Sequence, residues 1–232
     1  MTITFITGAN KGLGRETARR LVEAGHTVLV GARDPEAGAK AAAAVGARFV
    51  PIDVTDEASV AAAAADVAEH EGTIDVLINN AGIHGPAGDP SALTGADALA
   101  VFDVNLAGVV RTTTAFLPLL RRSADPVIIN VSSGMGSLAL THDPSRPESK
   151  VVAPLYTASK AALTMLTTQY AKAFPDIRVN AADPGYTATD LNGHSGPQTV
   201  TEGTDAIVAL ATEKPGASSG RFVSRTGEIA WS

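Results

Sequence analysis

A tyrosine and a lysine four residues apart, Tyr156 and Lys160, form the most chemically suggestive pair in this chain of 232 residues. They fall in a stretch with a helical pattern, and residues four apart on a helix lie on one face, about one turn apart. A phenol is a poor acid or base at neutral pH because its unperturbed pKa is about 10. A fixed ammonium favours the phenolate, so the spacing predicts that Lys160 lowers the pKa of Tyr156. A surface pair without a chemical role has the same spacing.

A glycine-rich loop follows the first expected strand and opens the first expected helix. The run Thr7–Gly14 reads TGANKGLG, with the spacing Gly-x-x-x-Gly-x-Gly. Glycines in this place let the backbone turn tightly and approach a pyrophosphate, and the helix N-terminus then faces the anion. The loop therefore predicts a dinucleotide site, with a glycine-rich turn that holds no ligand as the alternative.

Short β-branched runs alternate with alanine- and leucine-rich helical stretches along the whole chain. Continuous apolar strands separated by helices are typical of parallel strands that are buried on both faces. We therefore expect one α/β domain over residues 1–232, a Rossmann fold with a doubly wound parallel sheet of about seven strands and helices on both faces. The expected strands are Thr2–Ile6, Thr27–Val30, Arg48–Ile52, Val76–Ile78, Val127–Val131, Arg178–Ala181 and Arg221–Val223. The expected helices include Arg15–Ala24, Glu57–His70, Ala96–Phe116 and Leu155–Phe174.

Two stretches read as loops, Thr141–Val152 and Asn192–Gly203. The second holds Gly193, Gly196 and Pro197 among small polar residues, a composition that does not predict a packed helix. Because both loops lie next to the expected chemistry, we expect residues 192–203 to form a mobile lid over the substrate and the cofactor.

Composition excludes several classes of function. The net charge is −6 and there is no long basic run, which argues against nucleic acid or an anionic membrane as a partner. The chain has no cysteine, so disulfides and thiol catalysis are excluded, and its five histidines lack metal-ligand spacing. No metal site is expected. Because neither a signal peptide nor a membrane-spanning stretch is visible, we expect a soluble cytoplasmic protein.

Four motifs in order along the chain together resemble those of the short-chain dehydrogenase/reductase family. They are the glycine loop, Asn79-Asn80-Ala81-Gly82, the Tyr156/Lys160 pair and Pro184-Gly185. Further runs are similar to the carbonyl reductase branch: Asn10-Lys11-Gly12, Gly31-Ala32-Arg33-Asp34, and Gly220-Arg221-Phe222-Val223-Ser224 with Trp231. The resemblance implies an oxidoreductase in which a nicotinamide cofactor supplies the hydride.

The resemblance also implies roles for four catalytic residues. Ser133, the second serine after the fifth strand, would donate to the substrate carbonyl oxygen, with Ser132 as the alternative. Tyr156 would deliver the proton, and Lys160 would hold the nicotinamide ribose. Asn105 would help to hold a proton-relay water, with an ordinary polar helix residue as the alternative. Donors fixed where negative charge develops supply much of such catalysis.

The cofactor contacts that the resemblance implies come from loops at the ends of successive strands. Asp53 would accept from the adenine amino group, unless it is only a turn aspartate. Thr187 would meet the carboxamide through its backbone, and Thr189 would meet the pyrophosphate. The full set is Gly8, Asn10, Lys11, Gly12, Leu13, Gly14, Arg33, Asp53, Val54, Asn80, Ala81, Gly82, Tyr156, Lys160, Pro184, Gly185, Thr187 and Thr189.

The end of the second strand predicts NADP(H) as the cofactor. Enzymes that prefer NAD usually carry an acid there, which binds the ribose 2′-hydroxyl. Here Arg33 can pair with a 2′-phosphate, and Lys11 adds a second positive charge. Asp34 is instead well placed to cap a helix that begins at Pro35.

The chain departs from the family around the substrate region. Ser133 and Tyr156 are 23 positions apart, because the segment Leu140–Val152 is inserted between them. The insertion is shorter than in the carbonyl reductase branch, which leaves a monomer, a homodimer and a homotetramer all open. Position alone suggests residues that line the substrate pocket: His84, Leu138, Leu140, His142, Tyr186 and Leu191.

The leading hypothesis is an NADPH-dependent carbonyl reductase that acts on a small-molecule ketone or aldehyde. One alternative is a secondary-alcohol dehydrogenase that works in the oxidative direction. Another is a non-catalytic NADP-binding sensor, although such relatives usually lose the tyrosine or the lysine. The motifs leave the substrate open.

Overall fold

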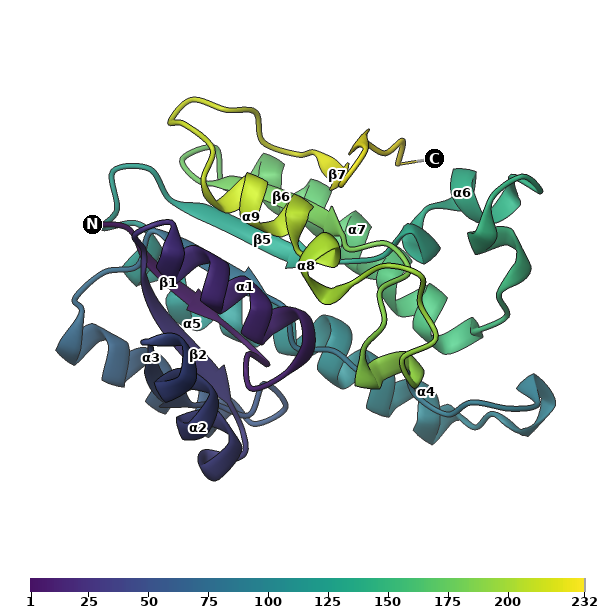
Figure 1. Ribbon diagram of the computed structural model, residues 1–232, viewed down its shortest axis with the longest axis horizontal. Helices are drawn as coiled ribbons and strands as arrows, with labels where there is room; N and C mark the ends of the chain where they lie inside the picture. Colours follow the sequence, from purple (N-terminus) through teal and green to yellow (C-terminus); the bar gives the residue numbers. More distant parts are fainter. Residues whose placement is uncertain (232) are drawn as a thin grey trace.

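The structure, a computed structural model, describes residues 1–231 and is built around one eight-stranded sheet with helices on both faces (Figure 1). The strand order is β3-β2-β1-β4-β5-β6-β7-β8. β1 to β7 run parallel, and β8 pairs antiparallel with β7. The strands are β1 Ile3–Ile6, β2 Thr27–Ala32, β3 Arg48–Pro51, β4 Val76–Asn79, β5 Val127–Val131, β6 Arg178–Asp183, β7 Phe222–Ser224 and β8 Gly227–Glu228. This is the expected Rossmann order, and its direction reverses between β1 and β4.

The helices alternate with the strands along the chain. They are α1 Gly12–Glu23, α2 Pro35–Val45, α3 Glu57–His70, α4 Gly95–Phe102, α5 Gly108–Leu120, α6 Leu138–His142, α7 Pro154–Ala173, α8 Val200–Gly203 and α9 Asp205–Ala211. A π-helical turn, Asp103–Ala107, joins α4 to α5, and a 3₁₀ turn, Pro147–Lys150, lies before α7.

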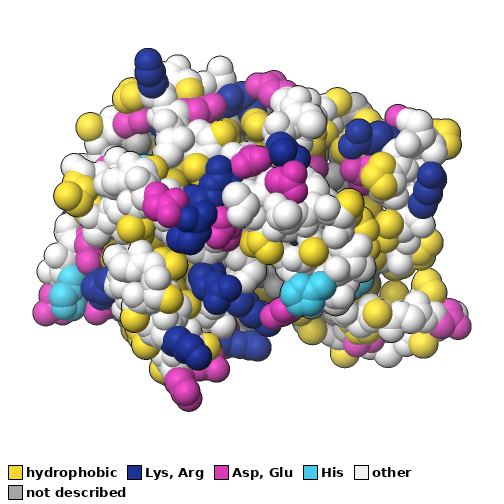
Figure 2. Space-filling view, in the orientation of Figure 1, with side chains coloured by type: hydrophobic (Ala, Val, Ile, Leu, Met, Phe, Trp, Pro, Cys, Tyr) yellow, Lys and Arg dark blue, Asp and Glu magenta, His cyan; other side chains and the backbone are white. Residues whose placement is uncertain are grey.

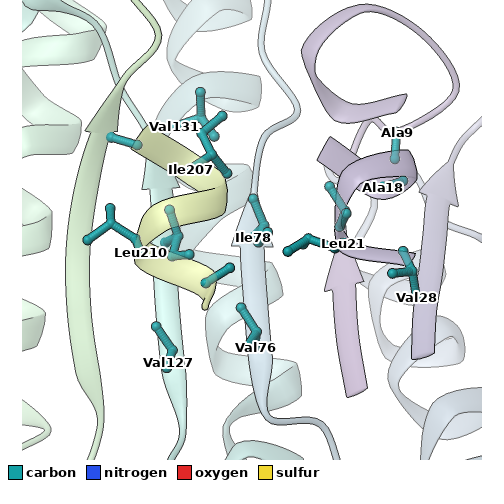
Figure 3. Close-up of a cluster of buried hydrophobic side chains, with 14 of the residues drawn as sticks. Ala9, Ala18, Leu21, Val28, Val76, Ile78, Val127, Val131, Ile207 and Leu210 are labelled. Atoms are coloured by element: carbon teal, nitrogen blue, oxygen red, sulfur yellow. The ribbon is translucent and has the colours of Figure 1, made fainter. Parts of the chain in front are cut away.

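The buried strands have continuous apolar sequences because both faces of the sheet are covered. Successive side chains point to opposite faces of a sheet, so Phe5 and Leu77 pack on one face while Ile6 and Ile78 pack on the other. Helices cover both faces, and both sets of side chains are therefore buried. Figure 3 shows Leu21 of α1 on the Ile78 side, with Ile207 and Leu210 of α9 above the neighbouring strands.

Buried amides anchor helix α7 to the middle of the sheet. The Nδ2 atom of Asn79 donates to the Oδ1 atom of Asn130 at 2.9 Å, which links β4 to β5. Asn130 in turn donates to the hydroxyl of Thr167 on α7 at 2.9 Å. Because buried polar groups need partners, this chain of bonds fixes where α7 lies against the strands. The helix that carries Tyr156 and Lys160 is thereby held in register with the sheet.

The seven expected strands are confirmed, with ends that differ by no more than two residues. The eighth strand, β8, was missed because it is a two-residue hairpin arm of exposed residues. The expected helix Ala96–Phe116 is interrupted by the π-helical turn. Asp34 does cap α2, where its Oδ1 atom accepts from the N–H of Ala37 at 3.0 Å.

Both segments that were expected to be loops contain short helices. Helix α6 and the turn Pro147–Lys150 lie within or across the first segment. In the second, the prediction that no helix forms was wrong, because α8 ends it. Thr199 and Glu202 form a capping box there, the pattern that starts a helix despite the glycines and proline before it.

Among the described residues, no helix combines the length and the apolarity needed to cross a membrane.

Candidate active site

A groove runs along the carboxyl ends of the parallel strands, where ligands bind in open α/β sheets. Its volume is about 610 Å³. Figure 2 shows Lys and Arg side chains gathered near the middle of the face where Figure 1 places the glycine loop and α8. Thirteen of the cofactor residues expected from sequence line this groove: Gly8, Asn10, Lys11, Gly12, Leu13, Gly14, Arg33, Asp53, Val54, Asn80, Ala81, Gly82 and Thr189.

Each glycine of the loop is required at its position for a separate geometric reason. A side chain on Gly8, whose φ is +64°, would lie 2.9 Å from the Cα atom of Ala81. One on Gly14 would lie 2.5 Å from the amide of Asn80, which itself donates to the carbonyl of Thr7 at 2.8 Å. A side chain on Gly12 would meet only the side chain of Thr189, at 3.8 Å, which is an ordinary contact; glycine is required there by the φ of +52° and not by crowding. The loop is thus tight on the protein side and open on the groove side.

The N-terminus of α1 is built to receive an anion. The helix begins at Gly12, and its N-cap residue Lys11 makes no side-chain cap bond. The first-turn N–H groups have no partner within the helix, and the helix dipole concentrates positive charge there. Gly12 lines the groove, and its position together with these free donors fits a dinucleotide pyrophosphate, which is the group that the loop predicts.

Cationic groups stand at the far end and along the rim of the groove. Arg33 is exposed at the end of β2, next to Asp53. The ammonium of Lys11 forms an exposed ion pair with Asp190 at 2.9 Å, across from the glycine loop to the segment after β6. Asp53 is a turn aspartate, because its Oδ1 atom accepts from the N–H and the hydroxyl of Thr55, and it also lines the groove. Both interpretations of Asp53 therefore fit the structure.

Tyr156, Lys160 and Ser133 come together where the groove ends. Tyr156 lies in the first turn of α7, and the ammonium of Lys160 is 5.6 Å from the centre of its ring. Lys160 is only 5% exposed and donates to the carbonyl of Val131 at 2.8 Å. Ser133 lies beside Tyr156, whereas Ser132 is buried and donates to the backbone carbonyl of Lys160. The geometry thus favours Ser133 over Ser132.

The expected effect of Lys160 on Tyr156 was wrong for the protein without a ligand. Burial raises the pKa of Tyr156 to about 12, the neighbouring Ser133 hydroxyl opposes this, and the charge of Asp183 adds to it. Burial also lowers the pKa of Lys160 to about 8. The reason is that desolvation disfavours the charged form of both groups. Tyr156 is therefore a protonated phenol across the neutral range.

Asn105 lies in the π-helical turn, and its amide is fully engaged. It accepts from the N–H of Ile83 at 2.8 Å and donates to the carbonyl of Ile83 at 2.9 Å. It also donates to the hydroxyl of Ser159 at 2.9 Å, next to Lys160 on α7. Asn105 thus ties the loop after β4 to the catalytic helix, and Ser159 is a site residue that the sequence argument missed. The part of Asn105 in holding a water stays a prediction.

An imidazole covers the catalytic tyrosine. The rings of His84 and Tyr156 are stacked, with centroids 5.1 Å apart and planes at 17°. His84 and Leu191 both line the groove, as expected for substrate-pocket residues. His142 instead lies on the exposed part of α6, where its Nδ1 atom pairs with the carbonyl of Leu138. His84 connects the groove physically to Tyr156.

Five of the expected cofactor residues do not line the groove: Tyr156, Lys160, Pro184, Gly185 and Thr187. The hydroxyl of buried Thr187 donates to the carbonyl of Pro184, and the N–H of Gly185 donates to Asp183. Their contacts with a cofactor stay predictions. Eight groove residues were expected neither as cofactor residues nor as substrate-pocket residues: Ala32, Asp34, Ile52, Thr55, Ile83, Gly85, Val104 and Asp190. Most of them are next to expected residues in the sequence, and they could have been predicted from that adjacency.

Known proteins share this fold and sequence. A family model described as short chain dehydrogenase matches residues 2–199. The short-chain dehydrogenase anuI of Penicillium roqueforti is 38% identical over 91% of this chain and 88% of its own length. The (-)-isopiperitenone reductase of Mentha piperita is 31% identical over 97% of both chains. The structure of an NADPH-bound carbonyl reductase from chicken fatty liver superimposes with a TM-score of 0.87, at 31% identity, over 100% of both chains. The chain therefore belongs to the short-chain dehydrogenase/reductase family of oxidoreductases.

Proposed function

We propose that the protein is an NADPH-dependent carbonyl reductase that converts a ketone or an aldehyde to an alcohol. The observation that carries this proposal is a half-buried, protonated tyrosine at the end of a dinucleotide-shaped groove, beside Ser133 and Lys160. Reduction needs a proton donor for the carbonyl oxygen. A phenol with a pKa of about 12 carries its proton across the neutral range and can still give it to the alkoxide that hydride transfer leaves, because an alkoxide is a stronger base than a phenolate. Oxidation of an alcohol needs the phenolate, which this environment disfavours.

Each catalytic residue has a distinct part in the proposed reaction. NADPH, when bound, supplies the hydride to the carbonyl carbon. The Ser133 hydroxyl donates a hydrogen bond to the carbonyl oxygen, and the Tyr156 hydroxyl gives that oxygen its proton. Lys160 supplies an ammonium fixed by the carbonyl of Val131, which offers donors to the cofactor ribose. Fixed donors of this kind stabilise the negative charge that develops on the oxygen.

Two cations support the preference for NADPH. Arg33 stands exposed at the groove end beside Asp53, where the fold family places the adenosine ribose. Lys11 lies on the same groove, and its partner Asp190 is an exposed side chain that a phosphate can replace. The carbonyl reductase that superimposes on this chain is described as NADPH-bound.

We also propose that the substrate carries a bulky apolar body. Large hydrophobic side chains around the loops after β4, β5 and β6 are exposed to solvent, among them Ile83, Leu138, Tyr186 and Leu191. Figure 2 shows this face hollowed between the surface at α6 and the surface before α4, with hydrophobic side chains along the hollow. Exposed apolar groups gathered at one place mark a binding surface.

Tyr156→Phe should abolish reduction and leave NADPH binding nearly intact, because only the hydroxyl transfers the proton. General acid catalysis contributes ~10²–10⁴-fold, so a loss in that range is expected. The assay is NADPH consumption with a panel of cyclic ketones, aromatic ketones, quinones and aldehydes, together with cofactor affinity. Tyr170→Phe is the matched control, since Tyr170 lies on the same helix but packs against Phe174. A Tyr156→Phe variant that keeps more than roughly a tenth of the rate would remove Tyr156 from the mechanism.

Arg33→Ala should weaken NADPH binding by about tenfold or more and leave NADH binding little changed, because a charged hydrogen bond contributes ~1.5–3 kcal/mol. Both cofactors are titrated against the wild type and the variant. Lys40→Ala serves as the control, because Lys40 is an exposed cation on α2 that does not line the groove. Equal losses for the two cofactors, or no loss, would show that another residue decides the preference.

Lys160→Met should abolish reduction yet cost little stability at pH 7, because the wild type carries a buried ammonium. The folded-state pKa of Lys160, about 8, lies below its ordinary value of 10.5. The unfolded chain therefore binds more protons between these values, and the stability of the wild type relative to Lys160→Met should rise as the pH increases from 8 to 10.5. Urea unfolding of both proteins across this range is the measurement. Lys172→Met, exposed on the same helix, should show no such trend, and a trend of opposite sign would contradict the assignment.

Residues 192–203 should lose mobility when NADP⁺ binds, because Asp190, two residues before the segment, pairs with Lys11 of the glycine loop, and Thr201 within it bonds to Glu16 of α1. The segment also makes contacts of its own, among them the Tyr186 hydroxyl paired with Ser195 at 2.7 Å and the N–H of Gln198 donating to the carbonyl of Tyr186 at 3.2 Å. Hydrogen exchange over seconds to minutes, with and without NADP⁺, measures the change, with α9 as an internal reference. If the segment is already protected without cofactor, it is a fixed wall of the pocket and not a lid.

A further inference from the structure

A buried carboxylate lies directly beside the catalytic serine and has no part in the mechanism above. Asp183 is the last residue of β6 and is 5% exposed. In the sheet, Val131 of β5 pairs with Ala182 of β6, and the N–H of Ser132 donates to the carbonyl of Ala182 at 2.8 Å. Asp183 therefore stands next to the step from Ser132 to Ser133, at the carboxyl edge of the sheet.

The two oxygens of Asp183 contact two different turns. Its Oδ1 atom accepts from the N–H of Gly185 at 2.9 Å, in the turn after β6. The N–H of Gly134, directly after the catalytic serine, faces this carboxylate and opposes the rise in its pKa. The Oδ2 atom lies 3.2 Å from the point where a side chain on Gly134 would begin, which places it against that turn.

We infer that Asp183 is a positioning residue that locks the Ser133–Gly134 turn to the Pro184–Gly185 turn. Carboxylates that accept from backbone N–H groups form strong, short hydrogen bonds, and burial shields them from competition by water. The catalytic hydroxyl and the turn expected to meet the nicotinamide end of the cofactor are thereby held at one fixed separation. This inference rests on the proposed function for the meaning of the two turns.

The charge of Asp183 has a second consequence, which a purely structural role would lack. The charged and titratable groups around Tyr156 are Lys160 from α7, His84 from the loop after β4 and Asp183 from β6. Asp183 in turn faces Arg146 and Glu148 from the segment before α7. Burial raises the pKa of Asp183, and the two backbone donors oppose this. In the alkaline range where Tyr156 ionises, Asp183 is an anion, and its charge opposes the phenolate.

Asp183→Asn tests both consequences with a side chain of the same shape. An amide has one acceptor oxygen, so it can serve one turn but not both, and it carries no charge. We expect the ionisation midpoint of Tyr156 to fall by roughly one pH unit, the size of a single nearby charge at an effective dielectric constant near 20. We also expect NADP⁺ to bind at least several-fold more weakly, because the Pro184–Gly185 turn is less well fixed.

The measurement is the ultraviolet absorbance of tyrosinate during a pH titration. Subtracting the same titration in a Tyr156→Phe background isolates Tyr156 from the other two tyrosines. Asp75→Asn is the matched control, since Asp75 also accepts from a backbone N–H, that of Ile3 at 2.7 Å, but lies at the opposite edge of the sheet. NADP⁺ affinity is measured on the same proteins. Asp183→Ala, which removes both acceptors, should bind NADP⁺ more weakly than Asp183→Asn. If Asp183→Ala does not fold, the inference is tested with Asp183→Asn alone.

The outcomes separate this inference from the proposed function. A lower Tyr156 midpoint together with weaker NADP⁺ binding in Asp183→Asn, and neither in Asp75→Asn, supports the positioning role even where no carbonyl compound is reduced. An unchanged midpoint, or unchanged NADP⁺ affinity, overturns it even where the wild type reduces ketones rapidly. A shift of equal size in Asp75→Asn also overturns it, because the effect would then follow net charge alone.

Discussion

The buried ammonium of Lys160 is the constraint around which the site is arranged. Removing a charge from water is costly, and in this structure one backbone carbonyl, that of Val131, accepts a hydrogen bond from it. The ammonium can occupy this place only because α7 is fixed against β5, where Asn130 bonds to Thr167. The same helix carries Tyr156 four residues earlier, so a bond network in the core decides where the phenol lies. Burying Lys160 lowers the stability of the fold, and it places a fixed charge at the end of the groove.

The groove depends on close packing between loops that lie far apart in the sequence. Asn80 bonds to the carbonyls of Thr7 and Gly8 and fills the space that a side chain on Gly14 would need. Asn105 likewise links separate parts of the chain, because its side chain bonds to Ile83 in the loop after β4 and to Ser159 on α7. Each amide uses donors and acceptors that would otherwise be unsatisfied, which makes the loops rigid without a ligand. A groove organised in this way loses little conformational entropy when a cofactor binds.

The fold was predictable from sequence because buried parallel strands and glycine-rich turns leave local patterns. The strand runs, the cap at Asp34 and the groove residues around Gly12 all follow from such patterns. The raised pKa of Tyr156 could not be predicted in this way, because it depends on which groups of the folded chain surround the phenol. Asp183 was missed for a related reason: its neighbour Gly134 is distant in sequence and comes close only through the pairing of β5 with β6.

The inserted segment between Ser133 and Tyr156 places charged side chains next to Asp183 and so affects its pKa. It folds back so that the carboxylate of Glu148 lies 2.8 Å from the point where a side chain on Gly134 would begin. Arg146 pairs with that carboxylate at 3.2 Å, while none of residues 1–231 pairs with its buried Oε2 atom. An acid so placed raises the pKa of Asp183, and Arg146 lowers it. A change in the length or charge of this insertion therefore acts on the turn that carries Ser133 without touching any catalytic side chain.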